Sequence, residues 1–269
     1  MSFFARLGLV FAALAFLSAC DETRPPRDGS FDAAANDDAA IADAAAQDTS
    51  IDDASTDASS PSDAGPELVG TISGSVGMVT TELSSVNPSI FVVNFDLGDG
   101  PWVEADLVER LVADARTLYA DTSSGGASAS LSEALAIEML VRAEGATLSK
   151  VGSAVIYDSP TAPKVDATVL IGGVRVGVHV TRAVSFPFGD PYTVEKATDL
   201  LTKKLGDVLL SAAGASAEDA WAKSMVVVVA YDEAAAASIA TAWAALDAQL
   251  KADTIVYVIV TDGDDAEVY

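Results

Sequence analysis

The chain has 269 residues, half of them hydrophobic, and a formal net charge of −25 at pH 7. This charge argues against a nucleic-acid-binding protein, because such proteins hold phosphates mainly with Lys and Arg side chains, and the 12 Lys and Arg residues after Pro66 are scattered. The chain has one cysteine, Cys20, so it forms no internal disulfide.

Residues 1–19 have the features of a secretion signal: a single Arg6, an apolar run from Leu7 to Leu17, and small residues before Cys20. The run is shorter than the roughly 18 residues that a membrane-spanning helix needs. Leu17-Ser18-Ala19-Cys20 resembles the lipobox of bacterial lipoproteins. The resemblance implies cleavage before Cys20, a diacylglycerol group on its sulfur, and an extracytoplasmic protein whose lipidated N-terminus binds a membrane. An ordinary signal peptide with an incidental cysteine is the alternative.

Residues 20–66 consist mostly of Asp, Ala, Ser, Thr and Pro, as in "FDAAANDDAAIADAAAQDTS". Such a segment buries too little apolar surface to offset its ordering entropy, so we expect a disordered, extended tether. An alanine helix is the alternative, although its scattered Asp residues lower helix propensity. Residues 67–269 remain for the folded part, and about 200 residues suffice for a single domain with one substantial core.

The first half of this domain predicts an edge element, a strand and two helices. Residues 68–82 alternate apolar with small residues and indicate a hairpin or ribbon at the edge of a sheet. Residues 89–97 form a β-branched, apolar run typical of a strand. Helical spacing of apolar residues follows over 103–119, and a capping box from Ser130 to Glu133 predicts a helix over 131–144.

The second half begins with three extended segments, "ATLSKVGSAVIYD", "VDATVLI" and "VRVGVHVTR", the last two joined by a Gly-Gly hairpin. A helix over 194–213, a wholly apolar strand over 225–231, a helix bearing Ile239, Trp243, Leu246 and Leu250, and a buried strand over 254–260 complete the chain. The fold class is therefore α/β, with a mixed central sheet and helices on both faces.

The order helix, three strands, helix, strand over residues 131–231, with Asp166 opening the second strand, resembles the PD-(D/E)XK nuclease-like superfamily. The resemblance implies a restriction-endonuclease-like core in which acidic residues bind a divalent metal. By this resemblance Asp166 takes the position of the metal-binding aspartate, and Glu138 or Glu133 that of the helix carboxylate.

The third strand departs from the family motif, because His179 stands where an acid belongs and Thr181 where a lysine belongs. Strand alternation places both on one face, together with Arg175 and Gly177. Threonine cannot supply a lysine's positive charge near a scissile phosphate. Magnesium also prefers oxygen ligands to the single Asp and imidazole offered by Asp166 and His179. The expected function is therefore non-catalytic binding or scaffolding, with an unidentified protein partner.

Several alternatives remain open. A metal-dependent hydrolase or nuclease would use Glu138, Asp166 and His179 with a divalent metal such as zinc. In a purely structural interpretation, His179 is a partly buried residue that forms a hydrogen bond with a neighbour such as Asp166. A Ser-His-Asp hydrolase lacks its G-X-S-X-G motif here. The acidic segments "DLGDGPW" and "TDGDDAE" lack the EF-hand pattern, so we interpret them as turns rather than calcium sites.

Overall fold

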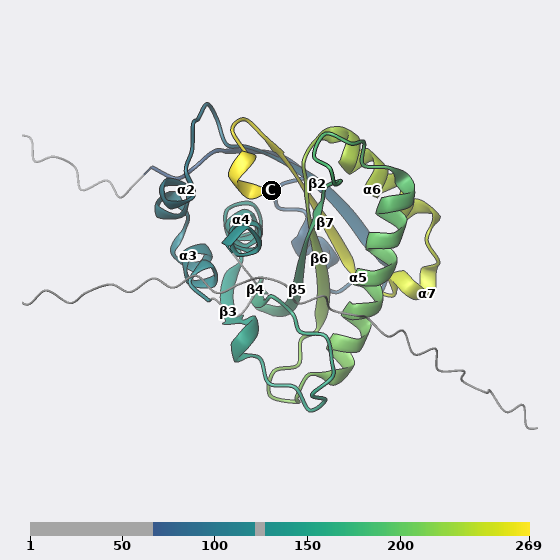
Figure 1. Ribbon diagram of the computed structural model, residues 1–269. Helices are drawn as coiled ribbons and strands as arrows, with labels where there is room; N and C mark the ends of the chain where they lie inside the picture. The colour runs from purple at the N-terminus through teal and green to yellow at the C-terminus, as the bar shows by residue number, and fades with distance from the viewer. Residues whose placement is uncertain (1–66, 122–126) are drawn as a thin grey trace, which may run out of the picture. The chain divides into compact units, whose positions relative to one another are not determined.

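The computed structural model describes residues 67–121 and 127–269 (Figure 1). The predicted signal peptide of residues 1–19, the lipidation candidate Cys20 and the predicted tether lie outside the described residues. Residues 60–269 form a compact unit by themselves. Since the sheet and both hydrophobic clusters are built from residues after position 66, this part of the chain can fold without the residues that precede it.

The structure is α/β, with a seven-stranded mixed sheet and helices on both faces, which confirms the predicted class (Figure 1). In chain order the elements are β1 (Thr71–Gly74), α1 (Val79–Glu82), β2 (Ser89–Asp96), α2 (Glu104–Arg110), α3 (Ala113–Tyr119), α4 (Ala127–Glu144), β3 (Thr147–Val151), the 3-10 turn η2 (Gly152–Ala154), β4 (Ala167–Ile171), β5 (Val174–Ala183), α5 (Val194–Gly214), β6 (Lys223–Ala230), α6 (Glu233–Ala245), α7 (Ala248–Lys251), β7 (Ile255–Asp262) and the 3-10 turn η3 (Ala266–Val268).

The strands lie in the order β1-β2-β7-β6-β5-β4-β3. The four central strands β2, β7, β6 and β5 are parallel, while β1 at one side and β4 and β3 at the other run antiparallel to their neighbours. Gly172 and Gly173 join β4 to β5 with φ of 56° and 82°. A tight hairpin turn with positive φ at both central positions favours glycine, so this part of the sequence prediction is confirmed.

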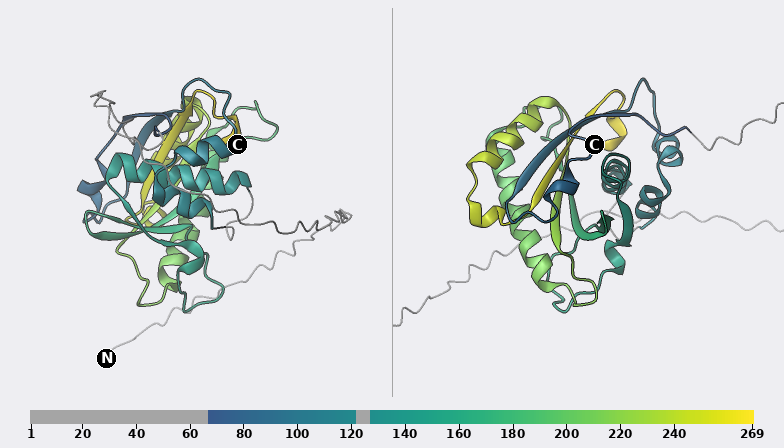
Figure 2. Two further views of the ribbon diagram at one scale, coloured as in Figure 1. Left: turned by 90° about the vertical axis from the view of Figure 1, so that its left-hand side faces the viewer. Right: turned by 180° about the vertical axis from the view of Figure 1, so that it is seen from behind.

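Two hydrophobic clusters cover the two faces of the sheet. Helices α2, α3 and α4 pack on one face (Figure 2), against residues such as Phe95 and Val178. Helices α5 and α6 pack on the other, against Val226 and Val258. Every residue of β6 is buried, as its uninterrupted apolar run predicts for a strand covered on both sides. No helix in the described residues has the length and apolar character required to cross a bilayer.

The predicted helix over 103–119 is wrong in one respect, because the chain leaves helical geometry at Leu111 and Val112, with ψ of 155° and 157°. The freed Val112 N–H donates to the Glu138 carboxylate at 2.6 Å. A buried carboxylate from another helix therefore stabilises the break between α2 and α3. Helical spacing within the segment carries no signal of such a distant partner.

Three other boundaries differ from the predictions. Helix α4 begins at Ala127, so Ser130 lies inside the helix and the predicted capping box does not start it. Helix α6 ends before Leu246, whose ψ is 153°, and Leu250 belongs to the short α7. Within residues 68–82 only β1 is a strand, and it pairs with β2 rather than folding back on its own segment.

Candidate functional site

Two of the candidate site residues lie at the start of β4 and on β5. Ala167, the first residue of β4, lies opposite Val178, so Asp166 directly precedes β4 and His179 directly follows Val178 on β5. His179 is paired with Val226 of β6, which belongs to the cluster under α5 and α6. His179 and Thr181 therefore face α5, as the alternation of the strand predicts.

Asp166 binds the backbone of β5. Its N–H donates to the Val178 carbonyl at 2.9 Å, and its Oδ2 accepts the Val180 N–H at 2.6 Å. Lys204 of α5 donates its ammonium group to the Val180 carbonyl at 3.2 Å. Because β4 begins at Ala167 and reaches no further along β5, these two side chains satisfy backbone groups that would otherwise lack a partner. Burial raises the pKa of Asp166, opposed by its bond to Val180 and the charge of Lys204.

His179 is 3% exposed, and its Nε2 has no hydrogen-bond partner within residues 67–121 and 127–269. The expected hydrogen bond to Asp166 is therefore not formed by this atom. Burial, assisted by the positive charge of Lys204, lowers the pKa of His179 to about 4. At neutral pH the imidazole is uncharged and lies in a packed layer between β5 and α5.

Glu138 belongs to α4, which packs on the opposite face of the sheet. It is fully buried and accepts hydrogen bonds from the Val112 N–H at 2.6 Å and the Arg142 guanidinium at 3.1 Å. Burial raises the pKa of Glu138, although these two partners oppose the shift. Glu133 is buried in the same helix.

The structure therefore does not bring Glu138 together with Asp166 and His179, because the sheet lies between them. This corrects the expectation that the first helix supplies a carboxylate to the same site. Within residues 67–121 and 127–269 no group of three or more His, Cys, Asp or Glu side chains is arranged to hold a metal ion.

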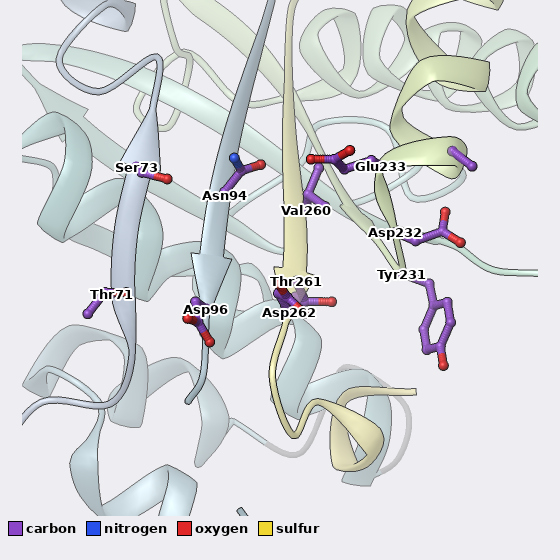
Figure 3. Close-up of a pocket in the computed structure, with 11 residues that line it drawn as sticks. Thr71, Ser73, Asn94, Asp96, Tyr231, Asp232, Glu233, Val260, Thr261 and Asp262 are labelled. Carbon is purple, nitrogen blue, oxygen red and sulfur yellow. The ribbon is translucent and has the colours of Figure 1, made fainter. Parts of the chain in front are cut away.

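A different group of residues surrounds an open depression of about 700 Å³, which we call the acidic crevice (Figure 3). It lies where β1, β2 and β7 extend beside the amino end of α6. Its residues are mostly polar, and four of them are acidic. They are Thr71, Ser73, Asn94, Asp96, Tyr231, Asp232, Glu233, Ala234, Val260, Thr261 and Asp262.

The topology explains why a crevice opens here. After β6 the chain turns to α6 on one face, whereas after β2 it turns to α2, α3 and α4 on the other. Strand β7 lies between these two diverging connections. In open α/β sheets, ligands bind in the crevice that such a divergence creates at the carboxyl ends of the strands. We call this side of the sheet the carboxyl edge.

The two acidic turns that the sequence presents separately meet at this edge. Asp96 and Asp262 end β2 and β7 and are paired in register. The Leu97 N–H donates to the Asp262 carbonyl at 2.9 Å, and the Asp264 carboxylate accepts the Trp102 N–H at 2.6 Å. Both segments are turns, as predicted, but together with α6 they place four carboxylates around one opening.

All four crevice carboxylates are exposed. Asp96 accepts the Gly98 N–H, and Asp232 caps α6 by accepting the Ala235 N–H. Each bond uses Oδ1 and leaves the Oδ2 of that aspartate for a ligand. Their remaining oxygens and Glu233 make the crevice a region of negative potential that attracts cationic groups. Sequence reasoning missed this site because it depends on β7 lying between β2 and β6. The two acidic turns were the available signal.

Comparisons with known proteins give little further information. No family model matches the chain, and no solved structure matches it. A protein of Dictyostelium discoideum described as "AAC-rich mRNA clone AAC4 protein" is 31% identical over 144 residues, which are 51% of this chain and 21% of that protein. The chain thus spans about a fifth of the length of this relative.

Proposed function

We propose that this is a lipid-anchored extracytoplasmic protein whose nuclease-like domain binds a positively charged partner through the acidic crevice, without catalysis. The main support is the crevice itself, an opening with four exposed carboxylates at the position where α/β sheets bind ligands. The order α4, β3, β4, β5, α5, β6 agrees with the order that the resemblance to the nuclease-like superfamily implies.

The family's metal-binding positions support the non-catalytic part of this proposal. Asp166 binds the β5 backbone, Glu138 binds Val112 and Arg142 on the other face, and His179 is buried. A catalytic site needs its groups within reach of one reacting atom, and these three are not arranged around a common opening.

Crevice binding is tested by titrating a lysine-rich peptide into a chain of residues 60–269 in a calorimeter. We expect Glu233→Lys to weaken binding by about threefold to tenfold, the effect of one reversed surface charge on a nearby cation. Glu218→Lys is the matched control, because Glu218 is an exposed residue in the loop before β6. If Glu233→Lys and Glu218→Lys weakened peptide binding equally, the weakening would come from the change in net charge alone. That result would contradict the proposal.

Lipid anchoring is tested by labelling cells that express the full chain with a radioactive fatty acid. We expect the label on the wild-type chain and its absence from Cys20→Ser, which cannot form the thioether. Wild-type protein without label, in the soluble fraction, would contradict this part of the proposal.

The second candidate is a metal-dependent hydrolase that uses Asp166 and His179, favoured by one observation. Among the described residues, Nε2 of His179 is buried without a partner, on the same strand whose Val180 N–H binds the Asp166 carboxylate. Titration of the 60–269 chain with Mg²⁺, Mn²⁺ and Zn²⁺, beside Asp166→Ala, tests it. Stoichiometric binding that the variant loses would favour this candidate over the non-catalytic one.

A further inference from the structure

A group of exposed aromatic side chains lies beside the acidic crevice. The loop of residues 184–193 between β5 and α5, which we call the aromatic loop, carries Phe186 and Phe188, 71% and 52% exposed. Their rings pack edge to face with centroids 5.0 Å apart. Phe188 and the 47% exposed Tyr231 line the same hollow of about 330 Å³. These exposed rings are therefore clustered on one part of the surface, and clustered exposed apolar side chains mark an interaction surface.

The base of the aromatic loop is fixed by hydrogen bonds. Ser185 Oγ donates to the Pro191 carbonyl at 3.0 Å and accepts from the Lys196 ammonium at 2.9 Å. Ser238 of α6 donates to the Tyr192 carbonyl at 2.8 Å. The phenylalanine rings are therefore presented by an anchored loop, and such pre-organised aromatic side chains lose little entropy on binding.

The far side of the aromatic loop is basic. Phe186 lines a second hollow, of about 410 Å³, together with Arg182, Lys196 and Lys203 and a single acidic residue, Asp199. Residues 67–269 contain 12 Lys and Arg against 28 Asp and Glu. The hollow therefore has more basic than acidic side chains, whereas the domain as a whole has more acidic than basic ones.

The two hollows and the acidic crevice form a row along the carboxyl edge. The basic hollow and the aromatic hollow share Ser185 and Tyr192, and the aromatic hollow and the crevice share Tyr231 and Asp232. The surface thus changes from basic, through aromatic, to acidic. An apolar centre with a charged rim is typical of a protein interface.

We infer that the partner of the acidic crevice is a second copy of this chain, bound by a two-fold contact in which the basic end of each copy faces the crevice of the other. This inference rests on the proposed function, because it names the occupant of the crevice. A two-fold rotation through the aromatic middle exchanges the two ends, so one surface is complementary to itself. The aromatic rings of the two copies then meet at the centre.

A surface with charges of both signs favours this occupant over a lipid surface. An anionic bilayer would attract Lys196 and Lys203 but repel the carboxylates of the adjacent crevice. In a self-complementary pair each end meets the opposite charge. The proposed lipid anchors would also hold copies on one membrane at a high effective concentration, so a weak contact suffices there.

Sedimentation velocity on the 60–269 chain tests the inference, over about 10 μM to about 1 mM, the range of weak interfaces. We expect a reversible monomer–dimer equilibrium. Lys203→Glu and Glu233→Lys should each weaken it by about tenfold or more, because every reversed charge then meets a like charge twice in the dimer. An equal mixture of the two variants should form a heterodimer. In it, the glutamate at position 203 of the Lys203→Glu chain faces the lysine at position 233 of the Glu233→Lys chain, so opposite charges meet again.

Two control variants separate local from net charge. Lys164→Glu and Glu218→Lys change exposed residues in the loops before β4 and β6 by the same charges, and should leave the equilibrium unchanged. Phe188→Ser should weaken the dimer with an unchanged circular dichroism spectrum. A monomer at all concentrations, or a mixture that does not associate, would overturn the inference, and so would a monomer that binds anionic phosphatidylglycerol vesicles through Phe188. If dimerisation fails while the lysine-rich peptide still binds the crevice, the proposed function stands without this partner.

Discussion

The buried carboxylates and the crevice carboxylates of this domain differ in what they bind. Four carboxylates, grouped here as the buried set, each accept at least one backbone N–H, from Val112, Val79, Val180 or Ile156. They are the buried Glu138, Glu144 and Asp219 and the half-buried Asp166. The crevice carboxylates are exposed, and where they form hydrogen bonds these are local caps and turns. Family position alone favours Glu138 and Asp166 of the first set as functional residues, whereas accessibility to a ligand favours the second set.

The largest expected effect tests whether the buried set is structural. Glu138→Ala removes the acceptor of the Val112 N–H at the break between α2 and α3. It also removes the buried carboxylate that pairs with the Arg142 guanidinium, which keeps its bonds to the Val69 and Gly70 carbonyls. We expect a loss of about 3–5 kcal/mol in the free energy of unfolding, as for other broken buried ion pairs. Urea denaturation followed by circular dichroism measures it.

Glu109→Ala is the control for this variant, because Glu109 is exposed and lies on α2 near the same break. It should change stability by less than about 0.5 kcal/mol. A Glu138→Ala protein as stable as this control would mean that Glu138 is held for another reason, and the contrast between the two sets of carboxylates would fail.

The second prediction concerns His179, which lies near Lys204 in the packed layer under α5. Its folded-state pKa of about 4 is below the unfolded value of 6.5, so the unfolded chain takes up the proton first as the pH falls. The stability contribution of neutral His179 is therefore complete above pH 6.5 and is lost between pH 6.5 and about 4. The loss amounts to about 3 kcal/mol at most, from 1.36 kcal/mol per pKa unit.

His179→Leu removes this titration and keeps an apolar side chain in the layer. Urea unfolding at several pH values gives the free energy of unfolding of both proteins as a function of pH. Above pH 6.5 the two plots should have the same slope. Below pH 6.5 the free energy of the wild-type protein should fall more steeply than that of the variant. Parallel curves down to pH 4 would show that the imidazole is open to water, and would return Asp166 and His179 to consideration as an accessible site.

The third prediction concerns the packing of Trp221 against β5, on the face that carries His179. A Cβ atom on Gly177 would lie 2.5 Å from the indole of Trp221, whose Nε1 is held by Ser224 at 2.9 Å. Gly177→Ala should therefore cost about 1–3 kcal/mol, as overpacking does in other cores. Thermal unfolding measures the loss, and tryptophan fluorescence reports the displaced ring. Gly206→Ala is the control, since a Cβ there meets nothing within 4 Å.

Local patterns predicted most of the fold. The apolar runs at 225–231 and 254–260 correspond to β6 and β7, and the Gly172-Gly173 pair is the hairpin between β4 and β5. Each of these features depends on residues close in sequence. The break at Leu111 and Val112 was not predicted, because its stabilising partner Glu138 is 26 residues away from Val112.

The candidate site was harder to predict from the sequence, because it too depends on residues that are far apart in the chain. Strand alternation correctly placed His179 and Thr181 on one face of β5. It carries no information on which face α4 covers, so it could not show that Glu138 lies on the other side of the sheet from His179. Asp96 and Asp262 are 166 positions apart and meet only because β7 enters the sheet beside β2. Strand order arises from the packing of the whole domain, and no short motif encodes it.

The smallest expected effect concerns the crevice carboxylates themselves. Asp96 and Asp262 are register partners at the ends of adjacent strands, and like charges at such positions destabilise a sheet slightly. The double variant Asp96→Asn, Asp262→Asn keeps the side-chain oxygens that accept the Gly98 and Gly263 N–H groups while removing both charges. We expect stability to rise by about 0.5 kcal/mol or less, and binding of the lysine-rich peptide to weaken. A set of carboxylates that costs stability and supports binding is what a functional crevice requires. If urea denaturation instead showed a clear loss of stability in this variant, the crevice carboxylates would be structural like the buried ones, and the distinction between the two sets would disappear.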